Sequence, residues 1–153
     1  MLSGHWTYRA YRNLTKLVGE DPQAALAMIF AEGVFELCQS DDGRVEGGLG
    51  METGYALRIT GSVETAGNGL GFTLIGNGLD GTATAGWRYE YRGVVAYIWP
   101  NGVDQVPSLL GTVVRVKAHR PNAPAGYTGS FIAVRHADNP APRTARPRSS
   151  LLR

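Results

Sequence analysis

One stretch of the chain alternates aromatic and charged side chains in a way that could build a binding site. Trp87, Tyr89 and Tyr91 fall on one face of a strand and the charged residues between them on the other, because successive strand side chains point to opposite sides. Buried tyrosine hydroxyls need hydrogen-bond partners. An interior that holds them is therefore either a hydrogen-bonded core or a pocket with polar groups on its wall, and the residues leave both open.

The beginning of the chain repeats this spacing. Trp6 and Tyr8 share one strand face, so we expect them to join the aromatic face of residues 87–91 in the interior. Pockets for small molecules use aromatic walls with a few polar groups. The pattern thus suits a packed aromatic core as well as a ligand pocket.

The segment YIWPNGVDQVP, residues 97–107, spends more residues than a hairpin needs. Longer loops on a rigid scaffold often carry function. Trp99 offers a stacking surface and Gln105 a hydrogen-bonding group, so both are predicted at the mouth of the site. In the alternative interpretation Trp99 plugs the barrel and Asp104 caps the turn.

His119 is predicted at the end of a strand over residues 108–119. Its ordinary pKa lies near neutrality, which suits an acid or a base, but no Ser or Asp partner is identifiable by spacing. The interior face of this strand is predicted to hold Leu110, Thr112, Val114, Val116 and Ala118. That assignment places Arg115 and Lys117 in solvent.

Other chemistries have no support in the sequence. It contains no P-loop, no G-x-S-x-G, no H-E-x-x-H and no EF-hand spacing. His5, His119 and His136 are far apart, and Cys38 is the single cysteine. We therefore expect no metal site, no cofactor and no intrachain disulfide.

The elements that must position these side chains read as eight short strands and one helix. Asp21 is predicted to cap a helix that begins at Pro22, within residues 21–29. The fold class is predicted to be all-β, a single eight-stranded antiparallel up-and-down barrel, which removes both exposed sheet edges. An open sandwich is the alternative. The predicted strands cover 4–13, 33–39, 44–51, 55–64, 70–79, 87–99, 108–119 and 127–137.

Composition separates a barrel domain, 1–136, from a tail, 137–153, that carries four Arg against one Asp. The tail therefore has a net charge of +3. Because the whole chain has a net charge of +2, the body has a net charge of −1. Such a body is a poor nucleic-acid surface. The tail is expected to be disordered, either simply solvated or a tether for an acidic partner. With no leader pattern and no apolar run near the roughly 20 residues of a membrane span, we expect a bacterial cytoplasmic protein without a membrane partner.

The opening Gly4-His5-Trp6 resembles the G-x-W signature on the first strand of lipocalins and avidins, which belong to the calycin barrels. The segments DGRVEGGLG and YALRITGSV are similar to early hairpins of avidin-like barrels. The segments HWTYRAYRN and WPNGVDQ resemble uncharacterised bacterial barrel proteins. In the calycins this Trp closes one barrel end, and lipocalins pack a late-strand Arg over it, a part that Arg135 would take.

The resemblance implies a barrel that binds a small apolar ligand, and outer faces that assemble into a homo-oligomer. It does not imply biotin binding, because the avidin ligand set has no match here, and the predicted helix follows the first strand rather than the barrel. Two alternatives remain. A cavity-templated cyclase or isomerase would need few catalytic groups, and a structural module would have a packed interior.

Overall fold

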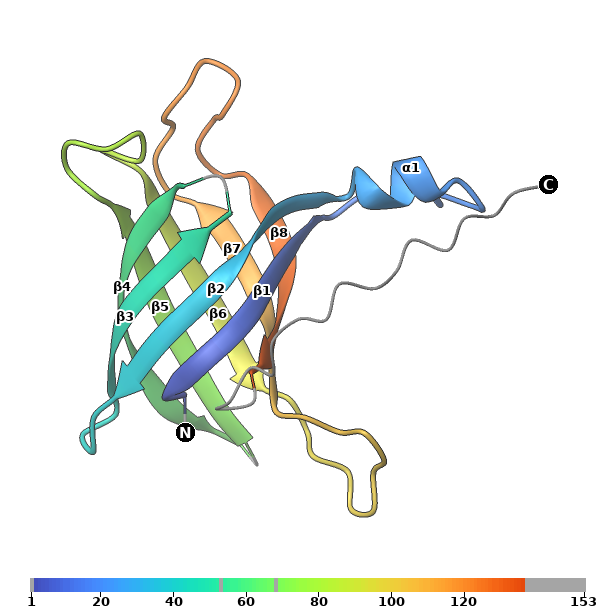
Figure 1. Cartoon of the computed structure of the whole chain (residues 1–153), viewed down its shortest axis with the longest axis vertical. Helices are drawn as coiled ribbons and strands as arrows, with labels where there is room; N and C mark the ends of the chain where they lie inside the picture. The colour runs from blue at the N-terminus through green and yellow to red at the C-terminus, as the bar shows by residue number, and fades with distance from the viewer. Residues whose placement is uncertain (1, 53, 68, 137–153) are drawn as a thin grey trace, which may run out of the picture.

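The structure, a computed structural model, describes residues 2–52, 54–67 and 69–136. It is the predicted closed barrel of eight antiparallel strands in sequence order, with β1 paired to β8 (Figure 1). The elements are β1 (Gly4–Arg12), α1 (Pro22–Leu26), β2 (Ile29–Gln39), β3 (Arg44–Met51), β4 (Ala56–Ala66), β5 (Gly69–Gly78), β6 (Arg88–Val95), β7 (Ser108–Arg115) and β8 (Thr128–Arg135). The predicted tail, 137–153, lies outside the described residues.

Up-and-down order places successive connections at alternating ends of the barrel. The β1–β2, β3–β4, β5–β6 and β7–β8 connections share one end, and the β2–β3, β4–β5 and β6–β7 connections share the other (Figure 1). We call the first the open end and the second the closed end. This alternation decides which loops can contribute to a common site.

Trp6 fills the closed end. Its side chain is buried, and its indole Nε1 donates a hydrogen bond to the Leu2 carbonyl over 2.9 Å. The Arg135 guanidinium lies over the Trp6 ring, with Cζ 5.5 Å from the ring centroid. The backbone of Gly4 approaches that guanidinium so closely that a Cβ there would lie 3.1 Å from it.

In the closed half of the barrel, aromatic rings pack against glycines at interior positions of the strands. Phe72 lies against Gly93, where an added Cβ would come within 2.6 Å of the ring. Phe131 lies against Gly111 in the same way, at 2.8 Å. These glycines make room for the rings because a protein interior has no spare volume at native packing density. The register of β6 is continuous with both neighbouring strands at Gly93.

A layer of three rings lies across the middle of the barrel. Tyr8 packs edge-on against Phe35 at 4.9 Å and against Tyr91 at 6.0 Å between centroids. Phe35 and Tyr91 close the triangle at 5.5 Å. The interior below this layer is filled by side chains, and the layer forms the boundary of the space above it.

The predicted helix is present but short. Asp21 caps it as expected, with its carboxylate accepting from the backbone N–H groups of Gln23 and Ala24. None of the residues of α1 is buried. The connection from β1 to β2 projects away from the barrel as an arm (Figure 1), on which Leu17 is 91 % exposed. No helix in the described ranges has the length and apolar character that a membrane crossing requires.

Two sequence expectations about the later strands are wrong. The predicted strand over residues 87–99 ends at Val95, because the chain leaves the sheet for the β6–β7 loop. The predicted inward face of residues 108–119 is reversed: Leu109 and Val113 are each 1 % exposed, whereas Leu110 is 41 % exposed. Since β7 pairs Gly93 with Gly111, the inward series is 109, 111, 113 and 115, so Arg115 faces the interior rather than solvent.

Candidate ligand pocket

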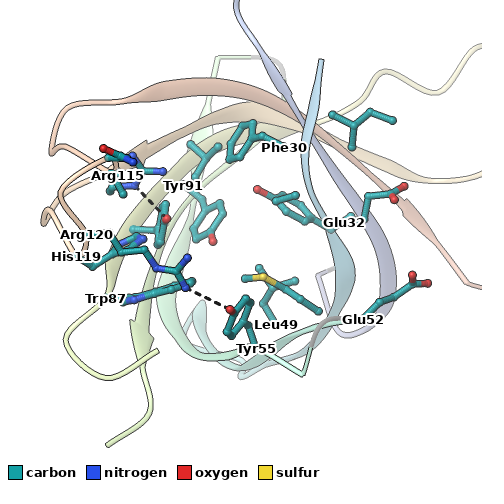
Figure 2. Close-up of a pocket in the computed structure, with 18 residues that line it drawn as sticks. Phe30, Glu32, Leu49, Glu52, Tyr55, Trp87, Tyr91, Arg115, His119 and Arg120 are labelled. Carbon is teal, nitrogen blue, oxygen red and sulfur yellow. Dashed lines mark hydrogen bonds between the residues drawn. The ribbon is translucent and has the colours of Figure 1, made fainter. Parts of the chain in front are cut away.

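A pocket of about 530 Å³ occupies the open half of the barrel, above the ring layer. This volume lies within the range of small-molecule sites. Side chains converge on the space from β1, β2, β3, β6 and β7 and from the connections at the open end (Figure 2). Leu49, Met51 and Val113 supply apolar wall, and aromatic residues supply most of the rest.

Two tyrosines form the floor. Tyr8 and Tyr91 are each 2 % exposed and both line the pocket. Within the described part of the chain neither hydroxyl has a hydrogen-bond partner, whereas the Tyr89 hydroxyl accepts a bond from Arg115. Burial raises the pKa of both floor tyrosines well above its ordinary value, and neighbouring tyrosines add to the shift. Both therefore stay protonated and present neutral O–H groups to the cavity.

Stacked aromatic rings form one side of the mouth. The His119 ring lies parallel to Trp87, with centroids 4.1 Å apart and planes 16° apart. Tyr55 packs against the same indole at 5.2 Å. The β5–β6 connection holds Trp87 in place. The backbone N–H of Trp87 donates to the Thr84 carbonyl, and the Thr84 hydroxyl donates to the Ala56 carbonyl.

Two arginines line this same wall. The Arg115 Nε donates to the Tyr89 hydroxyl over 3.2 Å, and its Nη1 donates to the Pro124 carbonyl over 3.2 Å. Arg120 donates to the Tyr55 hydroxyl over 3.2 Å, and its guanidinium lies 5.7 Å from the Trp87 ring centroid. Neither forms any of the four ion pairs found among the described residues.

The β7–β8 connection owes its shape to backbone hydrogen bonds rather than to burial. Arg120 pairs with Ala123 in an isolated bridge, and Gly126 donates to the Arg115 carbonyl over 2.8 Å. The Val116 N–H donates to the Arg88 carbonyl over 2.8 Å, which fixes the start of the loop to β6. These bonds place His119 and Arg120 over the barrel opening.

His119 is held in its neutral form. Its pKa is lowered first by burial, and then by the charges of Arg115 and Arg120, with the backbone of Lys117 acting weakly in the opposite sense. Its Nδ1 is buried without a hydrogen-bond partner. Because Nδ1 is buried, a hydrogen bond from this imidazole to a bound molecule would have to be made by Nε2.

The facing wall carries the opposite charge. Glu32 and Glu52 lie across the opening from the two arginines (Figure 2). Glu32 is already paired with Arg9 over 2.7 Å. The pocket therefore has a cationic wall with free guanidinium N–H groups and an acidic wall that is partly neutralised.

The structure brings five of the eight predicted ligand-binding residues together in this pocket: Tyr8, Trp87, Tyr89, Tyr91 and His119. Trp6 lies below the floor, at the closed end. The expectation that Trp99 and Gln105 lie at the mouth does not match their position, because the β6–β7 loop is at the closed end (Figure 1). Whether any of the eight binds a ligand stays a prediction.

The β6–β7 loop is nevertheless a defined structure. The Gln105 side chain bonds both backbone groups of Trp99, accepting from its N–H over 2.6 Å and donating to its carbonyl over 2.9 Å. Trp99 itself is 69 % exposed. The alternative interpretation, in which Trp99 plugs the barrel, therefore does not match the structure either.

Sequence reasoning missed the polar residues of the mouth. Arg115 was assigned to the outside, and neither Tyr55 nor Arg120 was singled out. The order of the connections could have found Tyr55 and Arg120. In a meander of eight strands the third and seventh connections share an end, so these two residues must lie near the same opening of the barrel.

A second depression, of about 610 Å³, lies against the outer wall. It forms over β3, where Gly48 and Gly50 leave the strand without outward side chains, and charged residues such as Glu36, Glu46 and Arg58 border it. It lacks the aromatic walls of the inner pocket. We therefore take the inner pocket as the candidate site.

Across the described ranges, no group of three His, Cys, Asp or Glu side chains could hold a metal ion. No protein-family model matches the chain, and no curated protein sequence matches it significantly. Fold and site thus define the class: a closed eight-stranded antiparallel β-barrel, packed at one end, with a pocket at the other.

Proposed function

We propose that the protein binds a small, largely apolar molecule in the open half of the barrel. The observation that carries this proposal is the unfilled space above Tyr8 and Tyr91, whose hydroxyls have no hydrogen-bond partner among the described residues and open onto it. A bound apolar molecule would cover the rings of the pocket wall and remove their apolar surface from water.

A calycin relationship of avidin or lipocalin type supports the same function. Arg135 lies over Trp6 at the closed end, as the G-x-W resemblance implies. Fold alone does not fix function, so the proposal depends on the pocket and not on the resemblance.

Native mass spectrometry of protein purified gently from its own host would test the proposal. We expect additional mass that is lost on denaturation. Ala31 lies in the pocket wall at a partly buried position, and Ala31→Trp would fill the space that the ligand needs. Trp99→Ala changes an exposed Trp at the closed end and is the matched control.

Loss of the extra mass in Ala31→Trp but not in Trp99→Ala would support the pocket as the site. Equal retention by wild type and both variants would place the molecule elsewhere and contradict the proposal. So would failure of the wild type to bind any apolar probe, such as N-phenyl-1-naphthylamine, at micromolar concentrations.

A cavity-templated isomerase or cyclase is the second candidate, and His119 is the observation that favours it. A neutral imidazole at the mouth could accept and return a proton, and the two protonated phenols at the floor could donate hydrogen bonds to the reacting molecule. An enzyme would lose turnover in His119→Gln while still binding ligand; a binding protein would show no turnover to lose. Comparing the mass of the retained molecule before and after incubation separates the two.

A further inference from the structure

Charge at the pocket mouth is arranged on one side. Arg115 and Arg120 lie on the β6–β7 wall and the β7–β8 connection, whereas Glu32 and Glu52 lie on the facing wall (Figure 2). A neutral apolar ligand would need no such separation. The arrangement points to a ligand whose own charge is at one end.

The two arginines are held in position by neutral groups. Their partners are the hydroxyls of Tyr89 and Tyr55 and the Pro124 carbonyl. A guanidinium carries five N–H donors in a planar fork, so these bonds leave several donors of each arginine free. Arginine binds oxyanions through such paired donors.

The acidic residues do not compensate these arginines. Glu32 is engaged by Arg9 over 2.7 Å, and neither Glu32 nor Glu52 approaches Arg115 or Arg120 within ion-pair distance. His119 stands between the arginines in sequence and, being neutral, adds no charge of its own. Within residues 2–52, 54–67 and 69–136 the cationic wall thus has no ion-pair partner.

We propose that the ligand is an elongated apolar molecule with a single oxyanion group, bound with its oxyanion at Arg115 and Arg120 and its apolar body toward Tyr8 and Tyr91. This inference rests on the proposed function, because it assigns the orientation of a ligand in that same pocket. The flat surfaces of Trp87 and His119 favour a planar or conjugated body, since stacked aromatic rings accept flat partners.

A matched pair of dyes tests the charge without knowledge of the natural ligand. N-phenyl-1-naphthylamine and 1-anilinonaphthalene-8-sulfonate share one aromatic body and differ in the sulfonate. The protein is first passed over a hydrophobic resin to remove any retained molecule. We expect both dyes to bind, the sulfonate more tightly, and Ala31→Trp to weaken both.

Arg120→Gln should weaken the sulfonate dye about three- to tenfold more than the neutral dye, the range expected for a partly exposed charged hydrogen bond. Arg58→Gln is the matched control, because it removes the same charge from the outer wall, outside the pocket. Glu52→Gln should shift the sulfonate affinity in the opposite direction to Arg120→Gln. Added salt should weaken only the sulfonate dye.

The outcomes separate the two proposals. If the neutral dye binds and Ala31→Trp weakens it, but Arg120→Gln changes both dyes equally, the pocket is a binding site and the anionic end is wrong. If Arg58→Gln weakens the sulfonate dye as much as Arg120→Gln, the dye responds to general charge or binds in the outer depression, and the inference is also overturned. If neither dye binds, the proposed function fails and this inference fails with it.

Discussion

The two interior tyrosines of β6 should respond to the same substitution by different amounts. Tyr91 is 2 % exposed and its hydroxyl has no partner from the described chain, whereas the Tyr89 hydroxyl accepts a hydrogen bond from Arg115 over 3.2 Å. Changing either residue to Phe removes one oxygen and keeps the ring. Only the change at Tyr89 removes a hydrogen bond.

The magnitude follows from this difference. Because the Tyr91 hydroxyl opens onto a cavity large enough for water, water can satisfy it in the ligand-free protein. Tyr91→Phe should therefore change the free energy of unfolding by less than about 0.5 kcal/mol in ligand-free protein. Tyr89→Phe should lower it by about 0.5–1.5 kcal/mol, the net worth of one hydrogen bond.

Urea unfolding followed by tryptophan fluorescence measures both values, and unchanged slopes would show that only stability has changed. For a chain of this length the Tm should move by about 2–4 °C per kcal/mol. The reasoning is refuted if Tyr91→Phe destabilises the ligand-free protein by more than about 1 kcal/mol while Tyr89→Phe does nothing. In that case the Tyr91 hydroxyl has a structural partner and is not kept for a ligand.

Three further expectations concern packing, pH and assembly. Gly93→Ala should cost about 1–3 kcal/mol of unfolding free energy, because its Cβ would meet the Leu110 carbonyl oxygen and lie 2.6 Å from the Phe72 ring. Gly50→Ala, with nothing within 4 Å, should cost less than about 1 kcal/mol. Similar losses would contradict the packing account. The pKa of His119 is lower in the folded protein than in the unfolded chain, so the unfolded chain binds more protons than the folded protein as pH falls through about 6.5. Wild type should therefore lose urea resistance between pH 7.5 and 5.5, and His119→Gln should lose less. Equal losses would speak against a neutral buried His119. We also expect the arm to join copies into a homo-oligomer, so Leu17→Ser should lower the mass measured by light scattering; an unchanged mass would remove the arm from any interface.

The barrel was predictable because its signals are local and repeated. Strand β4 alternates cleanly, and glycine-containing turns mark the ends of its neighbours. Asp21 and Pro22 marked the beginning of α1 within one residue. Closure then follows from eight strands in order, since a closed sheet leaves no edge unpaired.

The site was predictable only in part, because its polar residues break the interior pattern. Strand β7 offered two apolar faces, one with Leu110 and Val114 and one with Leu109 and Val113. The richer face was assigned to the interior, but an interior that is hollow at one end need not be apolar there. Arg115 lies on the inward face at that end, where burial no longer selects against charge.

The placement of Trp99 and Gln105 failed for a different reason. Their loop was judged by its length and its residue types, without counting connections. In an up-and-down barrel the sixth connection is always opposite to the seventh. His119 and Trp99 therefore could not share one mouth, and this rule needed only the number of strands.

The division of the barrel along its axis separates the residues that stabilise it from those that would bind. Below the ring layer, Phe72 and Phe131 fill the interior against glycines, and Trp6 with Arg135 closes the end. Above it, inward positions go to Tyr89 and Arg115, which contribute little apolar burial. A fold under selection for stability alone would fill this half as densely as the other. Selection for stability therefore does not explain the composition of the polar, half-open end.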